Sequence, residues 1–220
     1  MHGVRGKWVA GPQRNKVKEP GALSTLHCDY CFLVKQRAGE NEDGYDARRG
    51  SPIMVAYGSQ SRSLMAHYVV RKGVHPYSIR VLKTFIKKLG YSRMLYRTDQ
   101  ENAITALMEE VGRQSTAQMV PEESKAYDSQ SNGIVEAAVQ SFEKSFRTAR
   151  DALESRLGKR LIDDHPVFSW LTSNVAKNIN RFRIGTDGRT AHQRVTGKPF
   201  RVSVLEFGEH CFALMANTKS

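Results

Sequence analysis

The sequence has few cysteines and no long hydrophobic run, and each absence excludes a class of protein. Its three cysteines, Cys28, Cys31 and Cys211, are too few for a disulfide framework and suit a reducing compartment. The apolar segment 52–57 is far too short to span a bilayer, and no charged-then-apolar leader opens the chain. We therefore expect a globular intracellular protein, with no membrane partner.

Cys28 and Cys31 form a CxxC pair, but no second cysteine or histidine pair completes a zinc site. Because both lie in an apolar stretch, we interpret them as core residues, with structural zinc as the alternative. The 220 residues are enough for one full-sized domain with a substantial hydrophobic core.

Positive charge is concentrated at the two ends of the sequence. Residues 1–18 carry five basic side chains and no acid, and residues 19–143 carry fifteen of each sign. Residues 144–220 carry fourteen basic and seven acidic side chains. A neutral body with basic ends suits a polyanion such as DNA or RNA, held by counterion release, although a solvated basic surface gives the same pattern.

Hydrophobic periodicity predicts three strands, then helices alternating with strands. The predicted strands cover 24–32, 52–57, 64–71, 92–97 and 116–120, and the predicted helices cover 76–89, 100–111, 132–157 and 166–183. Gly90 and Gly158 are placed to end two of these helices. The order predicts an α/β fold with an antiparallel meander followed by crossovers. We divide the chain into a basic arm (1–22), a core (23–157) and a helical extension with a basic segment (158–220).

Three acids stand out by their positions. Asp29 lies inside the first apolar strand, Asp99 directly follows the fourth strand, and Glu136 lies one turn into the long helix. An unpaired carboxylate is costly to bury, and carboxylates held together need a compensating charge. Hard oxygen ligands select Mg²⁺ or Mn²⁺, and two such ions catalyse in-line phosphoryl transfer. We predict that Asp29 bridges two ions, Asp99 binds one and Glu136 the other.

Three stretches, LHCDYCFL, YRTDQENAI and DSQSNGIVEAAVQ, resemble the catalytic motifs of retroviral and retrotransposon integrases, the DDE family. The 36 residues between Asp99 and Glu136 are close to the spacing usual in that family. The resemblance covers residues 22–157 and continues more weakly through HPVFSWL, GTDGRTAHQRVTGK and EFGE, a run typical of retrotransposon polyproteins.

The resemblance implies a ribonuclease-H-like fold with a mixed five-stranded sheet flanked by helices. It also implies 3′-end processing and strand transfer of element DNA into target DNA, by a homo-oligomer. We infer a nuclear site of action from that substrate. The family's zinc domain and C-terminal β domain have no counterpart here, so we expect a fragment of a polyprotein or a decaying copy of an element.

Two groups of residues are predicted to contact DNA. The family's loop before the catalytic glutamate corresponds to Gln130, Ser131, Asn132 and Gly133, and on the helix that follows lie Lys144, Arg147 and Arg150. Each group has a structural alternative: Ser131 or Asn132 as the helix N-cap, and the basic residues as a solvated helix face.

Two further features remain open. We expect His27 to be structural and to point away from Asp29. The basic segment 181–189 suits either a nucleic-acid contact or a surface turn. Two other functions remain as alternatives: a catalytically silent DNA-binding remnant of a transposable element, and a ribonuclease H, which the SNGxxE helix opening disfavours.

Overall fold

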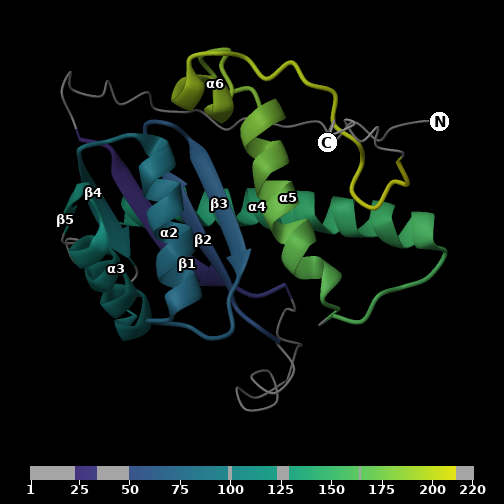
Figure 1. Ribbon diagram of the computed structural model, residues 1–220, viewed down its shortest axis with the longest axis horizontal. Coiled ribbons are helices and arrows are strands. Elements are labelled where there is room, and N and C mark those ends of the chain that lie inside the picture. The colour runs from purple at the N-terminus through teal and green to yellow at the C-terminus, as the bar shows by residue number, and fades with distance from the viewer. Residues whose placement is uncertain (1–22, 34–49, 99–100, 123–128, 164, 212–220) are drawn as a thin grey trace, which may run out of the picture.

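The computed structural model describes residues 23–33, 50–98, 101–122, 129–163 and 165–211 (Figure 1). The basic arm 1–22, most of the expected loop after the first strand and Asp99 lie outside the described residues. For Ser129–Asn132 only the backbone is described.

Nine of the elements follow the predicted order, with boundaries that shift by a few residues. The strands are β1 (Thr25–Cys31), β2 (Ile53–Gly58), β3 (Ser63–Tyr68), β4 (Arg93–Thr98) and β5 (Gln118–Pro121). The helices are α2 (Pro76–Leu89), α3 (Asn102–Gln114), α4 (Ser129–Leu157), α5 (Val167–Phe182) and α6 (Ala191–Thr196). The short helix α6 was not predicted.

The five strands form one mixed sheet in the order β3-β2-β1-β4-β5. β1 pairs with β2, and β2 with β3, in antiparallel register, whereas β1 pairs with β4, and β4 with β5, in parallel. The predicted meander followed by crossovers is confirmed. The central strand β1 therefore lies between an antiparallel and a parallel neighbour, and the carboxyl end of β4 lies beside it.

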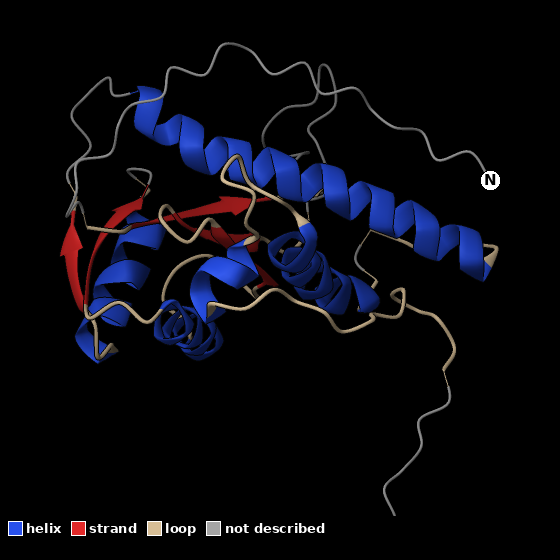
Figure 2. Ribbon diagram, turned by 90° about the horizontal axis from the view of Figure 1, so that it is seen from above, coloured by secondary structure: helices blue, strands red, loops and turns tan. Residues whose placement is uncertain are grey.

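Helices cover both faces of the sheet, and side chains alternate between two hydrophobic clusters (Figure 2). Leu26, Cys28 and Tyr30 of β1 join the cluster that contains α2 and α3. Cys31 joins the cluster that contains α4 and α5. Because side chains alternate along a strand, Asp29 faces the side of the sheet on which α4 packs.

α2 shows why some boundaries were predictable from sequence. His75 caps its N-terminus, because Nδ1 accepts a hydrogen bond from the Tyr77 N–H at 3.3 Å, and Pro76 occupies the first turn. Gly90 ends the helix in the left-handed conformation, at φ 74°. The predicted range, Pro76–Leu89, is confirmed.

The long helix α4 is anchored by an apolar stripe. Ala138, Phe142, Phe146 and Leu153 are buried against β1, β2 and α5. The stripe fixes how the first turns of the helix lie beside β1. Within the described ranges, no helix is long and apolar enough to cross a membrane.

α5 completes the hydrophobic core and covers the edge strand β3. Phe168, Leu171 and Val175 are buried in the same cluster as the α4 stripe. The Asn180 side chain accepts a hydrogen bond from the Leu64 N–H at 2.8 Å and donates to the Leu64 carbonyl at 2.6 Å. Unpaired backbone groups at the edge of a sheet favour aggregation. The Asn180 amide satisfies the N–H and the carbonyl of Leu64 at this edge.

Candidate active site

Asp29 lies in the middle of β1, half-buried, on the side of the sheet that faces α4. Its Oδ1 accepts a hydrogen bond from the Tyr30 N–H at 2.7 Å. The register pairs it with Val55 of β2, so it is held in the centre of the sheet.

Glu136 lies near the start of α4 and is exposed. Asp29 and Glu136 line one small cavity, of about 50 Å³, together with His27, Arg97 and Thr98. A water molecule occupies about 30 Å³ of liquid. The cavity therefore has room for small ions or water and not for an organic cofactor.

The third predicted acid, Asp99, lies outside the described residues, directly after Thr98 in the chain. The structure thus brings Asp29 and Glu136 together and does not describe the position of Asp99. Among the described residues, no group of three or more histidine, cysteine or acidic side chains is arranged to hold a metal ion.

The expectation that His27 points away from Asp29 is wrong. The two residues are two positions apart on a strand, so their side chains emerge on the same face, and both line the cavity. The ring is 3% exposed, which agrees with the expected structural role.

Arg97 is a site residue that was not predicted from the sequence. Its Cα pairs with that of His27, and its guanidinium lines the cavity. Its Nη2 forms an ion pair with Glu122 Oε1 at 2.9 Å, while its Nε has no hydrogen-bond partner in the described part of the chain. Arg97 lies two positions before Asp99, and residues two apart on a strand share a face, so the sequence did contain a signal for this residue.

Cys28 and Cys31 are buried on opposite faces of β1, one in each hydrophobic cluster. Burial raises the pKa of both thiols above the usual range. The charge of Asp29 adds to both shifts, and the charge of Glu143 adds to that of Cys31. The interpretation of the CxxC pair as core residues is confirmed.

The residues expected to form a loop before Glu136 lie in α4 instead, because the helix begins at Ser129. Ser131 and Asn132 are therefore inside the helix, and the interpretation of either as the N-cap is wrong. The side chains of Gln130, Ser131 and Asn132 lie outside the described residues. A Cβ added at Gly133 would meet open space, so this face of the helix is accessible.

The three basic residues of α4 have different surroundings. Lys144 is exposed on the helix surface, and Arg147 is 48% exposed and pairs with Glu143 at 2.9 Å. Arg150 pairs with Glu154 and with Asp163, both at 2.8 Å. It also donates to the Leu161 carbonyl and lies over the Phe168 ring, 4.8 Å from its centre. These contacts give Arg150 a structural role, and a DNA contact there stays a prediction.

No protein-family model and no curated protein matches the sequence. Among solved structures, the chain is similar to the catalytic core domain of BIV integrase, with 17% identity and a TM-score of 0.50. The similarity covers 79% of this chain and 93% of that one. The chain therefore has the ribonuclease-H-like fold of an integrase catalytic core, with the mixed five-stranded sheet that the sequence predicted.

Proposed function

We propose that this chain is the catalytic core of a metal-dependent polynucleotidyl transferase that cuts and joins DNA strands. The observation that carries the proposal is the convergence of Asp29, from β1, and Glu136, from α4, on one cavity. These are two of the three acids whose sequence motifs resemble those of the integrases.

The donor set fits Mg²⁺ or Mn²⁺. Two acidic residues line a space that accommodates small ions, and Asp99 follows Thr98, which also lines that space. In the proposal Asp29, Asp99 and Glu136 hold two ions, because like charges this close need cations between them. When bound, such a pair activates an attacking oxygen and stabilises the leaving oxygen of an in-line displacement.

The surrounding residues prepare the site. The Tyr30 N–H donates to one oxygen of Asp29, and Arg97, whose guanidinium is paired with Glu122, lines the same cavity. Because Glu136 is exposed, a DNA strand reaches its carboxylate from solvent. Pre-positioned charge of this kind lowers the cost of reorganisation during reaction.

DNA is the proposed partner, as element ends and as target, for 3′-end processing and strand transfer. The proposed contacts belong to α4: Gln130, Ser131, Asn132, Gly133, Lys144 and Arg147. Action in the nucleus, as a homo-oligomer and as part of a retroelement polyprotein, belongs to the same proposal.

The experiment is resolution of a branched DNA substrate, the reverse of strand transfer, with Mn²⁺. Wild type is compared with Asp29→Asn, Asp99→Asn and Glu136→Gln. Glu143→Gln is the matched control, because this carboxylate lies on the same helix and does not line the cavity.

We expect wild type and the control to resolve the branch, and each of the three acid variants to lose activity while remaining folded. Full activity in any acid variant would contradict the site assignment. An inactive wild type that folds and binds DNA would contradict the enzymatic proposal.

A further inference from the structure

A second cavity, of about 380 Å³, lies on the other flank of the first turns of α4. Ile134, Ala137 and Ala138 form its wall on α4. They are next in sequence to Val135 and Glu136, which line the cavity that contains Asp29, here called the acidic cavity. Its remaining wall comes from β2, the β2–β3 turn, the C-terminal end of α5, the loop after it, and α6. The two cavities therefore share one turn of a helix and lie roughly one helix diameter, about 10–12 Å, apart.

Three arginines distant in sequence meet at this second cavity: Arg62, Arg183 and Arg194. We call it the arginine cavity. Among the described residues that line it, none is acidic. Asp187 pairs with Arg194 from outside the lining. Positive charge therefore exceeds negative charge at its surface.

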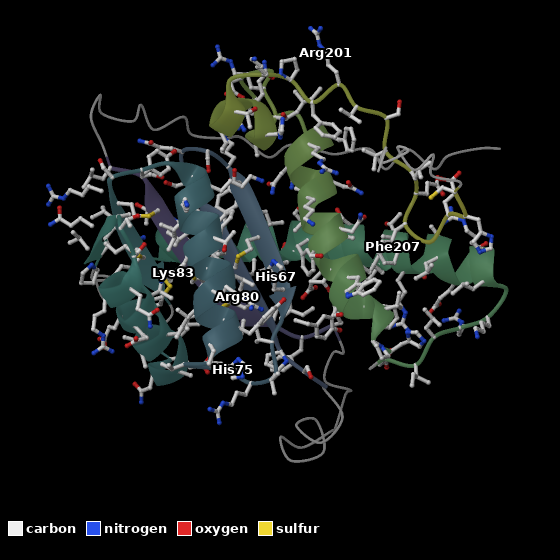
Figure 3. All side chains as sticks on the ribbon, in the orientation of Figure 1. His67, His75, Arg80, Lys83, Arg201 and Phe207 are labelled. Carbon is white, nitrogen blue, oxygen red and sulfur yellow. The ribbon has the colours of Figure 1, made fainter. Side chains whose placement is uncertain are left out.

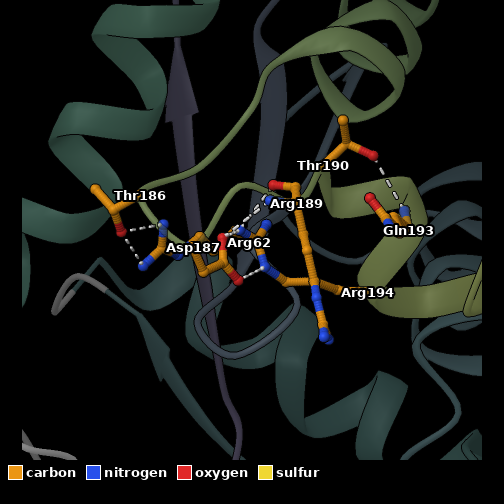
Figure 4. Close-up of polar contacts among 7 residues, drawn as sticks. All are labelled: Arg62, Thr186, Asp187, Arg189, Thr190, Gln193 and Arg194. Carbon is orange, nitrogen blue, oxygen red and sulfur yellow. Dashed lines mark hydrogen bonds and ion pairs between the residues drawn. The ribbon is translucent and has the colours of Figure 1, made fainter. Parts of the chain in front are cut away.

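The guanidinium groups of Arg62 and Arg194 are held in place by the loop between α5 and α6 (Figure 4), whereas Arg183 Nη1 donates to Ser141 Oγ on α4. Both Nη atoms of Arg62 donate to Thr186 Oγ1, at 3.2 and 3.3 Å. Arg194 Nε donates to Asp187 Oδ2 at 3.0 Å, and Nη2 donates to the Arg189 carbonyl at 2.9 Å. The Arg194 side chain is only 11% exposed, so this geometry is fixed before any ligand binds.

Two backbone positions at the cavity, Gly185 and Arg62, are sterically or conformationally unusual. A Cβ at Gly185 would lie 2.7 Å from Arg62 Nη1 and would meet Arg194 Nη2 still more closely, so a larger residue here would displace the two guanidinium groups. Arg62 itself adopts φ 55°, a left-handed conformation that a residue with a side chain rarely takes. Strain of this kind clusters at binding sites.

Tyr57 shows that the three positive charges converge. Burial raises the pKa of its hydroxyl above the usual range, and the charges of Arg62, Arg183 and Arg194 all oppose that shift. The hydroxyl therefore lies within electrostatic reach of all three guanidinium groups and remains a hydrogen-bond donor at neutral pH.

We propose that the arginine cavity binds a backbone phosphate of the DNA strand that enters the acidic cavity. Fixed guanidinium groups match phosphate oxygens in geometry and charge, and the site would hold the strand in register. This inference rests on the proposed function, because it assigns the second contact of the same substrate. Within the basic segment 181–189 it assigns the nucleic-acid contact to Arg183.

The test measures binding of a fluorescent DNA duplex to the full chain by anisotropy, in EDTA, so that metal and catalysis play no part. The variants are Arg62→Gln and Arg183→Gln. Arg189→Gln is the matched control, because it removes the same charge from the same loop and does not line the cavity. Gly185→Ala crowds the guanidinium groups without changing the net charge. Circular dichroism checks that each variant is folded.

We expect Arg62→Gln and Arg183→Gln each to weaken DNA binding about tenfold, and to reduce the slope of log affinity against log salt by about 0.9, the value for one phosphate contact. Gly185→Ala should weaken binding as well, and Arg189→Gln should stay within about twofold of wild type. An equal effect of Arg189→Gln would overturn the proposal in favour of general surface charge.

A second arm uses inorganic phosphate alone, by calorimetry. Tight phosphate binding combined with unchanged DNA binding in the two arginine variants would overturn the proposal, since the cavity would then be a site for free phosphate. Because these measurements exclude metal, their outcome is separate from that of branch resolution by the acid variants.

Discussion

At its N-terminal end α4 presents Glu136 and lies between two cavities, whereas at its C-terminal end its charged side chains bind other parts of the chain. Arg150 pairs with Glu154 and Asp163, and Arg156 pairs with Glu206 and donates to the Phe207 carbonyl at 2.7 Å. Figure 3 shows Phe207 beside α4 and α5, against whose cluster it packs.

The difference shows that charged residues have two roles along α4: some lie near cavities, and others form ion pairs and hydrogen bonds within the protein. Near Glu136, charged groups face open cavities, where ions and phosphates can approach. Near Arg150, they fasten the following loop and the C-terminal segment to the helix. The N-terminal end should therefore control activity, and the C-terminal end stability.

The largest expected effect is on the rate of branch resolution. Glu136→Gln should lower it about a thousandfold, because a bound metal ion contributes several kcal/mol of transition-state stabilisation. Arg150→Met should leave the rate per folded molecule within about twofold. A large loss of rate in folded Arg150→Met would break the distinction between the two ends.

The middle of α4 should contribute to the stability of the whole fold, because it packs in the hydrophobic core. Phe146 is buried between Phe142 and Phe168, with ring centres 6.0 and 5.7 Å away. Phe146→Ala should lower the free energy of unfolding by about 3–5 kcal/mol, as measured by urea denaturation. A loss below about 1 kcal/mol would mean that this stripe does not anchor α4.

Substitutions of two arginines of α4, Arg150 and Arg147, should differ by a smaller amount in their effect on the free energy of unfolding. Arg150→Met should cost about 1–2 kcal/mol, because it leaves the buried Glu154 carboxylate without its charged partner. Arg147→Met should stay within about 0.5 kcal/mol, since the Arg147 side chain is about half exposed and makes a single ion pair. Equal unfolding midpoints for the two variants would contradict the structural role of Arg150.

The smallest effect is a pH dependence at the C-terminal end. A hydrogen bond from Arg150, with a second from the Leu161 N–H at 3.0 Å, lowers the pKa of Glu154 below its usual range. Because the folded-state pKa is lower than that of the unfolded chain, the stabilisation is present above the usual glutamate value of about 4.3. It is lost as the pH falls through the lowered value.

The difference in unfolding midpoint between wild type and Glu154→Gln should therefore be largest near neutral pH and should shrink below about pH 4. A difference that grows on acidification would show that the carboxylate is not held in its charged form.

Local signals made much of the fold predictable. His75, Pro76 and Gly90 mark the two ends of α2, and the position of Asp29 in an apolar strand identified a candidate site residue. α6 was missed because it has six residues and buries only Ala191, although Thr190 and Gly197 cap its ends.

The other cavity residues depend on tertiary packing. Arg62, Arg183 and Arg194 have no common motif, and only the placement of the α5–α6 loop against the β2–β3 turn brings them together. Arg147 and Arg150 look alike in sequence, because nothing local indicates that Asp163 and Leu161 fold back onto Arg150. His27 was assigned to the wrong face although strand alternation gave the answer.

The most direct test of the central claim is calorimetric titration of the full chain with Mn²⁺. Wild type should bind the ion, Asp29→Asn and Glu136→Gln should each bind it at least about tenfold more weakly, and Glu143→Gln should match wild type. Equal Mn²⁺ binding by wild type and both acid variants would contradict the claim that Asp29 and Glu136 together hold a catalytic metal ion.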